Sequence, residues 1–200
     1  MSELALREVK LPIGSFGRKS SGWYGVWTLV LTEAAIFAYL LFSYFYLASQ
    51  ANGDWPMGGP PSLKLAAPNT LVLLLSSAAL IWAERSGARR GKRWQLLSGL
   101  GASFVLGVVF VIVQLREWQT KSFSMHSGTY GSSYFIVTGF HLAHVIVGLL
   151  LLLTLFFWAL RGLFDRERHA PLTIGAIYWH FVDVVWLIVF TALYLVPRLR

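Results

Sequence analysis

The chain of 200 residues alternates between long apolar runs and short polar stretches, and five of the runs are nearly free of Asp, Glu, Lys and Arg. A helix that crosses a hydrocarbon core about 30 Å thick needs about 20 apolar residues, because each residue rises about 1.5 Å. Each of the five runs is long enough for one crossing. The pattern therefore predicts an all-α fold, an integral membrane bundle of five transmembrane helices. Their approximate ranges are 23–48, 65–85, 94–116, 131–160 and 171–196.

Residues 23–200 are expected to form a single five-helix membrane domain, and residues 1–22 a short polar segment in the cytoplasm. The connections between the runs are short, so no second folded unit is expected. Within the third run, Gly99, Ser103 and Gly107 recur every four residues. Small side chains at this spacing let two helix backbones approach closely in lipid. The stripe is therefore predicted to be a helix-packing face.

The basic residues are distributed unevenly between the two sets of connections. Twelve of the 17 Lys and Arg residues lie before the first run, between the second and third, or between the fourth and fifth. The side with more Lys and Arg is usually cytoplasmic, which places the N-terminus in the cytoplasm and the C-terminus outside. The net charge of +8 is then explained by topology and by attraction to anionic lipids, and we expect no nucleic-acid partner.

The composition narrows the chemistry that this chain can perform. Hydrophobic residues make up 56% of the chain and charged residues 13%, against roughly 25% charged residues in an average soluble domain. The chain has no cysteine, which excludes disulfides, thiolate zinc sites, iron–sulfur clusters, covalently attached haem c and cysteine-bound copper. Most redox centres are therefore excluded from this chain.

Five ionisable side chains lie well inside the apolar runs. A charge at the centre of a bilayer costs at least about 2.5 kcal/mol, so it is retained only with a partner or a function. Glu33 lies ten residues into the first run, about 15 Å deep and among apolar neighbours, so it needs a partner from another helix. The five candidates are Glu33, His141, His144, His180 and Asp183.

Three interpretations of these five residues are open. His141 and His144 are three residues apart on one helix, as are His180 and Asp183 on another. The set could therefore bind a metal ion or a haem. This interpretation is disfavoured, because di-iron bundles usually provide four carboxylates and two histidines on one helix cannot bind opposite faces of a haem. The second interpretation is a proton relay. The third is a hydrogen-bond network that fixes helix packing, in which His180 and Asp183 can satisfy each other.

Three long strings in the last two runs resemble the signature stretches of subunit III of the haem–copper terminal oxidases. They are GTYGSSYF at 128–135, TGFHLAHVIVG at 138–148 and YWHFVDVVW at 178–186. The segment around Glu33 resembles the family's buried, carbodiimide-reactive glutamate segment, and strings near Asn69 and Gln114 resemble its next two helices. The resemblance covers residues 22–196 and is specific, because long and rare strings occur in the right order with the right separations.

The resemblance implies a chain with no redox centre or catalytic residue of its own, packed on subunit I of a proton-pumping oxidase that reduces dioxygen to water. The haems and the copper are then expected in subunits I and II, which are the expected partners together with membrane lipids. Subunit III of this family is thought to hold phospholipid between its helices, to provide a route for dioxygen, to sustain proton uptake by subunit I and to protect its active site. The five ionisable residues would form one buried polar network where the helices meet. The match is slightly closer to the cytochrome c branch of the family than to the quinol branch.

Two departures from the family pattern concern the lipid site. The longer form of the family has two further helices before the first run, which complete its lipid cleft, and this chain resembles the shorter five-helix form. Family members often have a basic residue late in the fourth helix, where this chain has Trp158, with Arg161 one turn nearer to the headgroups. Arg161 and Trp158 are therefore the candidate lipid contacts.

Two other functions stay open at this stage. A closely similar accessory protein accompanies some nitric oxide reductases, and a membrane transporter is the other alternative, although the five runs do not divide into two similar halves. The short polar start lacks the length and the Arg- and Ser-rich pattern of a transit peptide. The sequence therefore favours a multi-pass protein of the bacterial plasma membrane.

Overall fold

The structure is a computed structural model, and it describes residues 21–51, 55–56, 58–88, 92–164 and 170–199. The N-terminal segment 1–22 lies outside the described residues except for its last two. Within the described residues every regular element is a helix, and five helices are long and apolar enough to cross a membrane. The five-helix, all-α fold is thus confirmed, whereas the orientation of the chain in the membrane stays a prediction.

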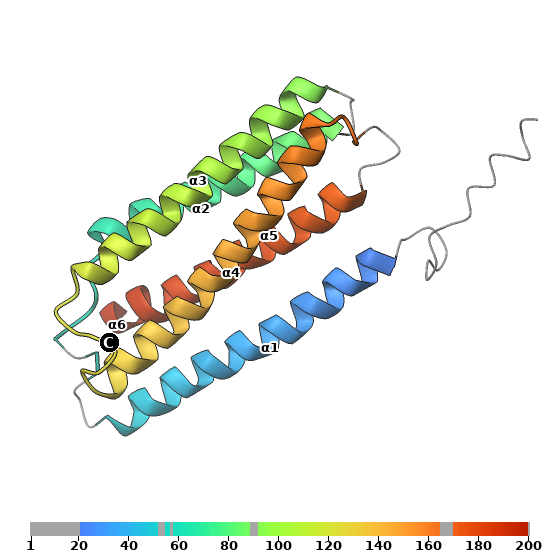
Figure 1. The fold of residues 1–200 in the computed structure, drawn as a ribbon. Helices are drawn as coiled ribbons and strands as arrows, with labels where there is room; N and C mark the ends of the chain where they lie inside the picture. The colour runs from blue at the N-terminus through green and yellow to red at the C-terminus, as the bar shows by residue number, and fades with distance from the viewer. Residues whose placement is uncertain (1–20, 52–54, 57, 89–91, 165–169, 200) are drawn as a thin grey trace, which may run out of the picture.

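The five helices follow one another along the chain with short connections (Figure 1). Together with the helical segments that continue two of them, they contain the predicted ranges and extend slightly beyond most of their ends. The second continues into a π-helical segment, η2 (Ala83–Ala88), and the last continues through η3 (Thr191–Leu195) into α6 (Val196–Leu199). The five are α1 (Ser21–Gln50), α2 (Leu63–Trp82), α3 (Arg93–Gln119), α4 (Thr129–Leu160) and α5 (Ala170–Phe190).

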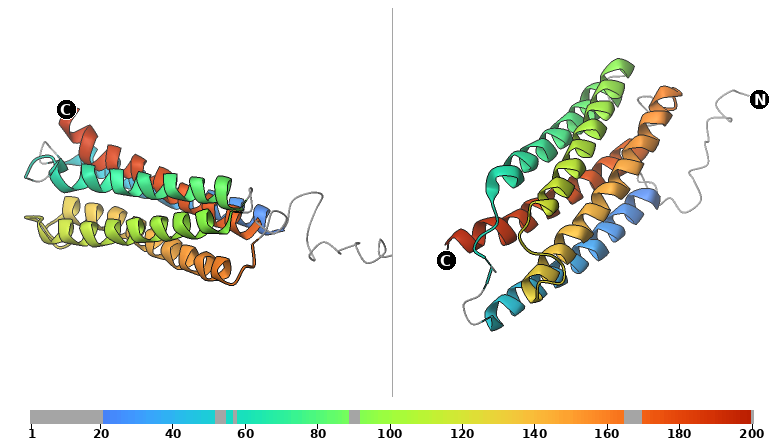
Figure 2. Two further views of the ribbon diagram at one scale, coloured as in Figure 1. Left: turned by 90° about the horizontal axis from the view of Figure 1, so that it is seen from above. Right: turned by 60° about the vertical axis from the view of Figure 1, so that its left-hand side comes forward.

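The helices α2 to α5 form the body of the bundle, and α1 packs along one side of it against α4 and α5 (Figures 1 and 2). The end of the bundle where α1 and α3 end is called the Glu117 end below, and the opposite end is called the Glu84 end. Helix α1 buries only four of its side chains, which are spaced by four or seven residues and so form one narrow stripe. They are Val26, Val30, Phe37 and Tyr44.

The small-residue stripe of α3 packs against its neighbours as predicted. A Cβ atom at Gly99 would lie 2.6 Å from the Cβ of Ala83, so the backbones of α3 and η2 are in close contact. One turn further, the hydroxyl of Ser103 donates a hydrogen bond to the backbone oxygen of Ser76 on α2. A Cβ at Gly107 would lie 2.8 Å from the ring of Trp179. Small side chains are therefore required along this face.

Two tryptophans attach α5 to α2 through their indole groups. Trp179 Nε1 donates to Ser76 Oγ at 3.1 Å, and Trp186 Nε1 donates to Thr70 Oγ1 at 2.9 Å. Both indoles are buried, with exposed fractions of 1% and 0%. An indole N–H buried among helices needs such an acceptor, so these bonds fix which face of α5 is turned toward α2.

Candidate functional site

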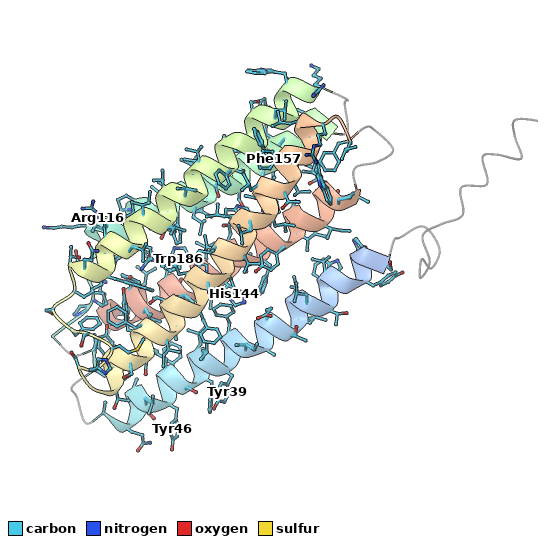
Figure 3. All side chains as sticks on the ribbon, in the orientation of Figure 1. Tyr39, Tyr46, Arg116, His144, Phe157 and Trp186 are labelled. Carbon is cyan, nitrogen blue, oxygen red and sulfur yellow. The ribbon has the colours of Figure 1, made fainter. Side chains whose placement is uncertain are left out.

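The carboxyl group of Glu33 finds its partner on another helix. Its Oε2 atom lies 2.9 Å from Nε2 of His144, which joins the middle of α1 to the middle of α4. The pair is partly exposed, with 23% of the Glu33 side chain and 15% of the His144 side chain accessible. Figure 3 shows His144 on the side of α4 that faces α1. The sequence argument that Glu33 needs a partner from another helix therefore holds.

The hydrogen bond of the other ring nitrogen of His144, Nδ1, shows which nitrogen is free to share a proton with Glu33. Nδ1 lies 2.7 Å from the backbone oxygen of Phe140, and a carbonyl oxygen can only accept, so Nδ1 carries a hydrogen. One further proton is shared between Glu33 and Nε2. With this proton on Glu33 both groups are neutral, and with it on Nε2 they form an ion pair. In either state the pair has no net charge and keeps its hydrogen bond.

An apolar groove lies along α1 close to this pair. It has a volume of about 350 Å³ and lies between α1, α4 and α5. Glu33 is one turn beyond the lining residue Leu29, and His144 is one turn before the lining residue Val147, so the pair is one helical turn away from the groove lining. The hydroxyl of Tyr178 lies 3.4 Å from the backbone oxygen of His144. The groove is lined by Gly22, Gly25, Val26, Leu29, Val147, Leu151, Ile174 and Tyr178.

Two further candidates, His180 and Asp183, are linked through a serine of α2. The hydroxyl of Ser77 donates to Oδ2 of Asp183 and lies 2.8 Å from Nδ1 of His180. Because the hydroxyl hydrogen points at the carboxylate, Nδ1 of His180 is the donor to Ser77. The expected direct bond between His180 and Asp183 is thus replaced by a bridge, since both side chains point from α5 toward α2. Ser77 carried no signal in the sequence analysis, because a serine in a helix more often bonds its own backbone.

The fifth candidate, His141, is fully buried among aromatic rings. Its ring centroid lies 4.8 Å from that of Trp186, 5.9 Å from that of Phe110 and 6.4 Å from that of Phe37. Neither of its nitrogens has a hydrogen-bond partner among the described residues. The structure thus brings the five residues together as two hydrogen-bonded groups and a separate histidine. They are not one network because α4 turns His144 toward α1, whereas His180 and Asp183 face α2.

A buried polar cluster at the Glu117 end was missed by the sequence analysis. Oε1 of Glu117 lies 2.7 Å from Nζ of Lys121 and 2.8 Å from the hydroxyl of Tyr194, which in turn lies 2.5 Å from the hydroxyl of Tyr134. The ammonium group also lies 5.2 Å and 5.3 Å from the centres of the Tyr134 and Tyr194 rings. The Glu117 and Lys121 side chains are only 3% and 8% exposed. Their spacing of four residues at a helix end is typical of a solvated surface pair, so their burial was not predictable from local spacing.

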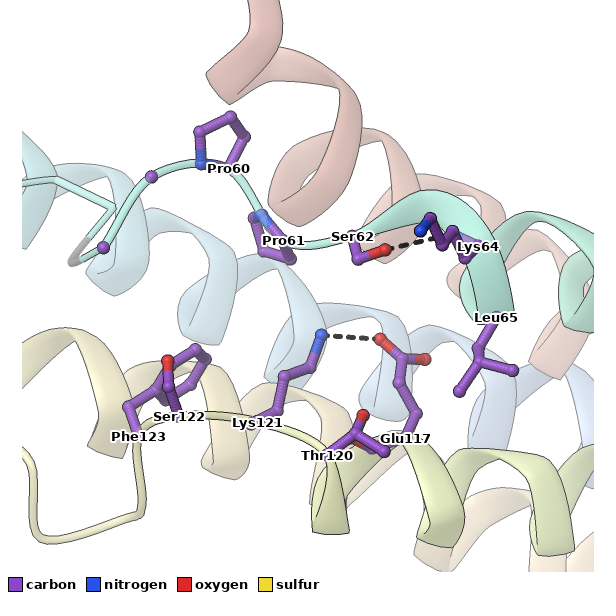
Figure 4. A pocket seen from close by; sticks show the side chains of 12 residues that line it. Pro60, Pro61, Ser62, Lys64, Leu65, Glu117, Thr120, Lys121, Ser122 and Phe123 are labelled. Atoms are coloured by element: carbon purple, nitrogen blue, oxygen red, sulfur yellow. Dashed lines mark hydrogen bonds and ion pairs between the residues drawn. The ribbon is translucent and has the colours of Figure 1, made fainter.

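The Glu117–Lys121 pair lies beside a pocket formed by the two connections at this end of the bundle (Figure 4). The pocket has a volume of about 550 Å³. Pro60 and Pro61 lie on one side of it, and Phe123 lies on the other. The cluster therefore ties the end of α3 to the connection after it and to the C-terminal part of the chain.

The two candidate lipid contacts lie at the Glu84 end of α4. Arg161 follows the last residue of α4 and is exposed, and Trp158 is 39% exposed. Trp158 comes seven residues, or about two helical turns, after Leu151, so it lies on the same face of α4 as the groove lining. Arg161 is a further turn away from the membrane centre.

Metal-binding groups are not gathered anywhere in the part of the chain that the structure describes: no group of three or more His, Asp or Glu side chains could hold a metal ion there. Four of the five candidates, Glu33, His144, His180 and Asp183, instead take part in interhelical hydrogen bonds. Together with the five spanning helices, these observations define an integral membrane helical bundle with a polar interior.

The comparisons with known proteins identify the family. The model of the family "Cytochrome c oxidase subunit III" matches residues 18–197, so this chain belongs to that family. Curated relatives called "Cytochrome c oxidase subunit 3" from Hippopotamus amphibius, Ovis aries and Equus caballus are each 35% identical to it over 178 residues. Each alignment covers 86% of this chain and 68% of the relative. The resemblance stated from the sequence is confirmed, and the chain belongs to a family of oxidoreductase subunits.

Proposed function

We propose that this chain is the non-redox subunit III of a proton-pumping haem–copper oxidase, packed on subunit I and holding phospholipid. In this proposal the haems and copper belong to subunits I and II, and the chain supports proton uptake and the stability of the active site. The name of its relatives favours cytochrome c over quinol as the electron donor. The proposed location is a bacterial plasma membrane, with the N-terminus in the cytoplasm and the C-terminus outside.

The observation that carries the lipid part of this proposal is the apolar groove between α1, α4 and α5, one helical turn from the Glu33–His144 pair. The groove begins in the first turn of α1, where Gly22 and Gly25 have no side chains to fill it. Its lining is almost entirely hydrocarbon and aromatic, which suits an acyl chain. The nearby polar pair has no net charge in either proton arrangement, so it is compatible with an apolar neighbour.

The same pair supports a role in holding α1 to the bundle. Helix α1 buries few side chains, and in a membrane helices associate through packing and interhelical hydrogen bonds because lipid tails are as apolar as leucine. The Glu33–His144 bond supplies such an interaction at mid-depth. An acyl chain in the groove would fill the remaining space between α1 and its neighbours.

Purification of the chain from its native membrane tests the assembly. A mild affinity purification should bring down two larger subunits together with haem absorbance. A copper-binding subunit II among them would identify a cytochrome c oxidase. Co-purification with a nitric oxide reductase, or a colourless chain without partners, would overturn the proposal, and the latter result would favour the transporter.

A substitution in the groove tests the lipid. A Cβ atom at Gly25 would have no atom within 4 Å, so Gly25→Leu should fill the groove without disturbing the backbone. The purified complex should then retain less phospholipid, measured by mass spectrometry of extracted lipid, and should inactivate sooner during turnover. The matched control is Ala102→Leu, on an exposed face of α3. Equal lipid content in both variants and in the parent would show that the groove holds no lipid.

A further inference from the structure

Three side chains in the centre of the bundle have polar atoms without a partner. They are Asn69 on α2, Gln114 on α3 and His141 on α4, and their exposed fractions are 1%, 0% and 0%. Five of their atoms have no hydrogen-bond partner among the described residues: Asn69 Oδ1, both amide atoms of Gln114, and both ring nitrogens of His141. A buried polar group left unpaired costs about 1–3 kcal/mol, so five such atoms in one core require an explanation.

The three side chains are gathered around one residue, Phe110. The amide nitrogen of Asn69 donates to the backbone oxygen of Phe110 at 3.1 Å. Gln114 is the next residue on the same face of α3, one turn further along. The ring of His141 lies 5.9 Å from the ring of Phe110. Asn69 and His141 thus contact Phe110 from two helices, and Gln114 follows it by one turn on the same face of the third.

The chemistry of these atoms selects the ligand. Asn69 Oδ1 and the oxygen of Gln114 are acceptors, the nitrogen of Gln114 is a donor, and a neutral His141 has one donor and one acceptor. A metal ion would need acceptors only, and an anion would need donors only. A set that mixes both, with no formal charge, is complementary to water, which donates two hydrogen bonds and accepts two.

The aromatic residues around His141 are themselves buried. Phe110 and Trp186 are fully buried, and Phe37 is 3% exposed. The indole of Trp186 lies against His141, and its own N–H is already bonded to Thr70. Aromatic rings therefore surround His141 without supplying the hydrogen bonds that its nitrogens lack.

We propose that Asn69, Gln114 and His141 bind internal water, which completes their hydrogen bonds at the centre of the α2–α5 bundle. Buried water typically makes about three hydrogen bonds to groups that are otherwise unsatisfied, and three side chains from three helices provide that number. The water joins α2, α3 and α4 where no direct side-chain bond does. This inference does not rest on the proposed function.

A high-resolution map of the purified complex tests the site directly. Density for a water oxygen is expected within hydrogen-bond distance, about 2.7–3.2 Å, of at least two of the three side chains. A map that resolves waters elsewhere in the bundle but contains none here would overturn the proposal, as would direct bonds between the three side chains.

X-ray radiolytic footprinting of the same complex provides a second test. Bound water yields hydroxyl radicals in place, so the ring of Trp186 should be oxidised although it is closed to bulk solvent. In the variant Gln114→Leu this oxidation should fall toward background, while that of exposed Trp94 stays unchanged. Equal oxidation of Trp186 in the parent and the variant would overturn the proposal.

Stability measurements separate a hydrated site from a dry one. In a hydrated site, Gln114→Leu and His141→Leu each remove partners of the same water, so each should lower the unfolding temperature. The double variant should then lose less than the sum of the two. If both single substitutions raise the unfolding temperature, the polar atoms are dry and the proposal fails.

Discussion

Replacing Glu33 by glutamine or by leucine has different effects on the hydrogen bond to His144. Because Nδ1 of His144 carries a hydrogen that points at Phe140, its Nε2 can accept a bond from the amide of a glutamine. Glu33→Gln therefore keeps the link between α1 and α4 but can no longer exchange a proton. Glu33→Leu removes both the link and the proton.

The structure sets the size of the two effects. Leucine leaves Nε2 without a partner at membrane depth, which costs about 1–3 kcal/mol. The 15% exposure of the His144 side chain favours the lower half of that range. Glutamine keeps a hydrogen bond to Nε2, so its cost should stay below about 1 kcal/mol.

Thermal unfolding of the purified complex, read together with turnover and the rate of inactivation, checks this prediction. Glu33→Gln should resemble the parent in all three measurements, and Glu33→Leu should unfold at a lower temperature and inactivate sooner. If Glu33→Gln slows turnover or proton uptake as much as Glu33→Leu does, the carboxyl group acts by carrying a proton. The packing role argued here would then be refuted.

Substitutions at Lys121, Gly148 and Arg161 have predicted effects on stability or on bound lipid. Lys121→Met removes the partner of a buried carboxylate, which costs about 3–5 kcal/mol, and the double variant with Glu117→Gln should recover most of this loss in thermal unfolding. A Cβ at Gly148 would lie 2.7 Å from the ring of Trp179, so Gly148→Ala should destabilise the bundle by about 1–3 kcal/mol through overpacking, measured in the same way. Arg161→Ala should shift stability by less than about 0.5 kcal/mol because the residue is exposed, while lowering the anionic phospholipid that co-purifies; unchanged lipid would exclude Arg161 as a contact.

The helices could be predicted because apolar length alone decides which segments can cross a membrane. The packing face at Gly99 and Gly107 was also predictable, since close approach of helices requires small residues at fixed spacing. How each helix is rotated about its axis was not predictable to the same degree. That rotation decides that His144 meets Glu33, and it depends on contacts between segments far apart in the sequence.

The parts of the site that the sequence missed have ordinary sequence patterns. Ser77 looks like any helical serine, and its role as a bridge follows only from α2 and α5 lying together. Glu117 and Lys121 look like a surface pair, and they are buried because Tyr134 and Tyr194 cover them. Burial of charge at a helix end depends on what the neighbouring chain segments cover, so local spacing does not reveal it.

The narrow buried stripe of α1 has a consequence for how this protein is handled. Helix α1 buries only four of its 30 residues, so most of its surface must be solvated by molecules that do not belong to this chain. The position of α1 then depends on the surrounding molecules as well as on the rest of the chain. Replacing lipid by detergent should loosen α1 before any other helix. The time at which a protease first cleaves α1 would then report how fast lipid is lost.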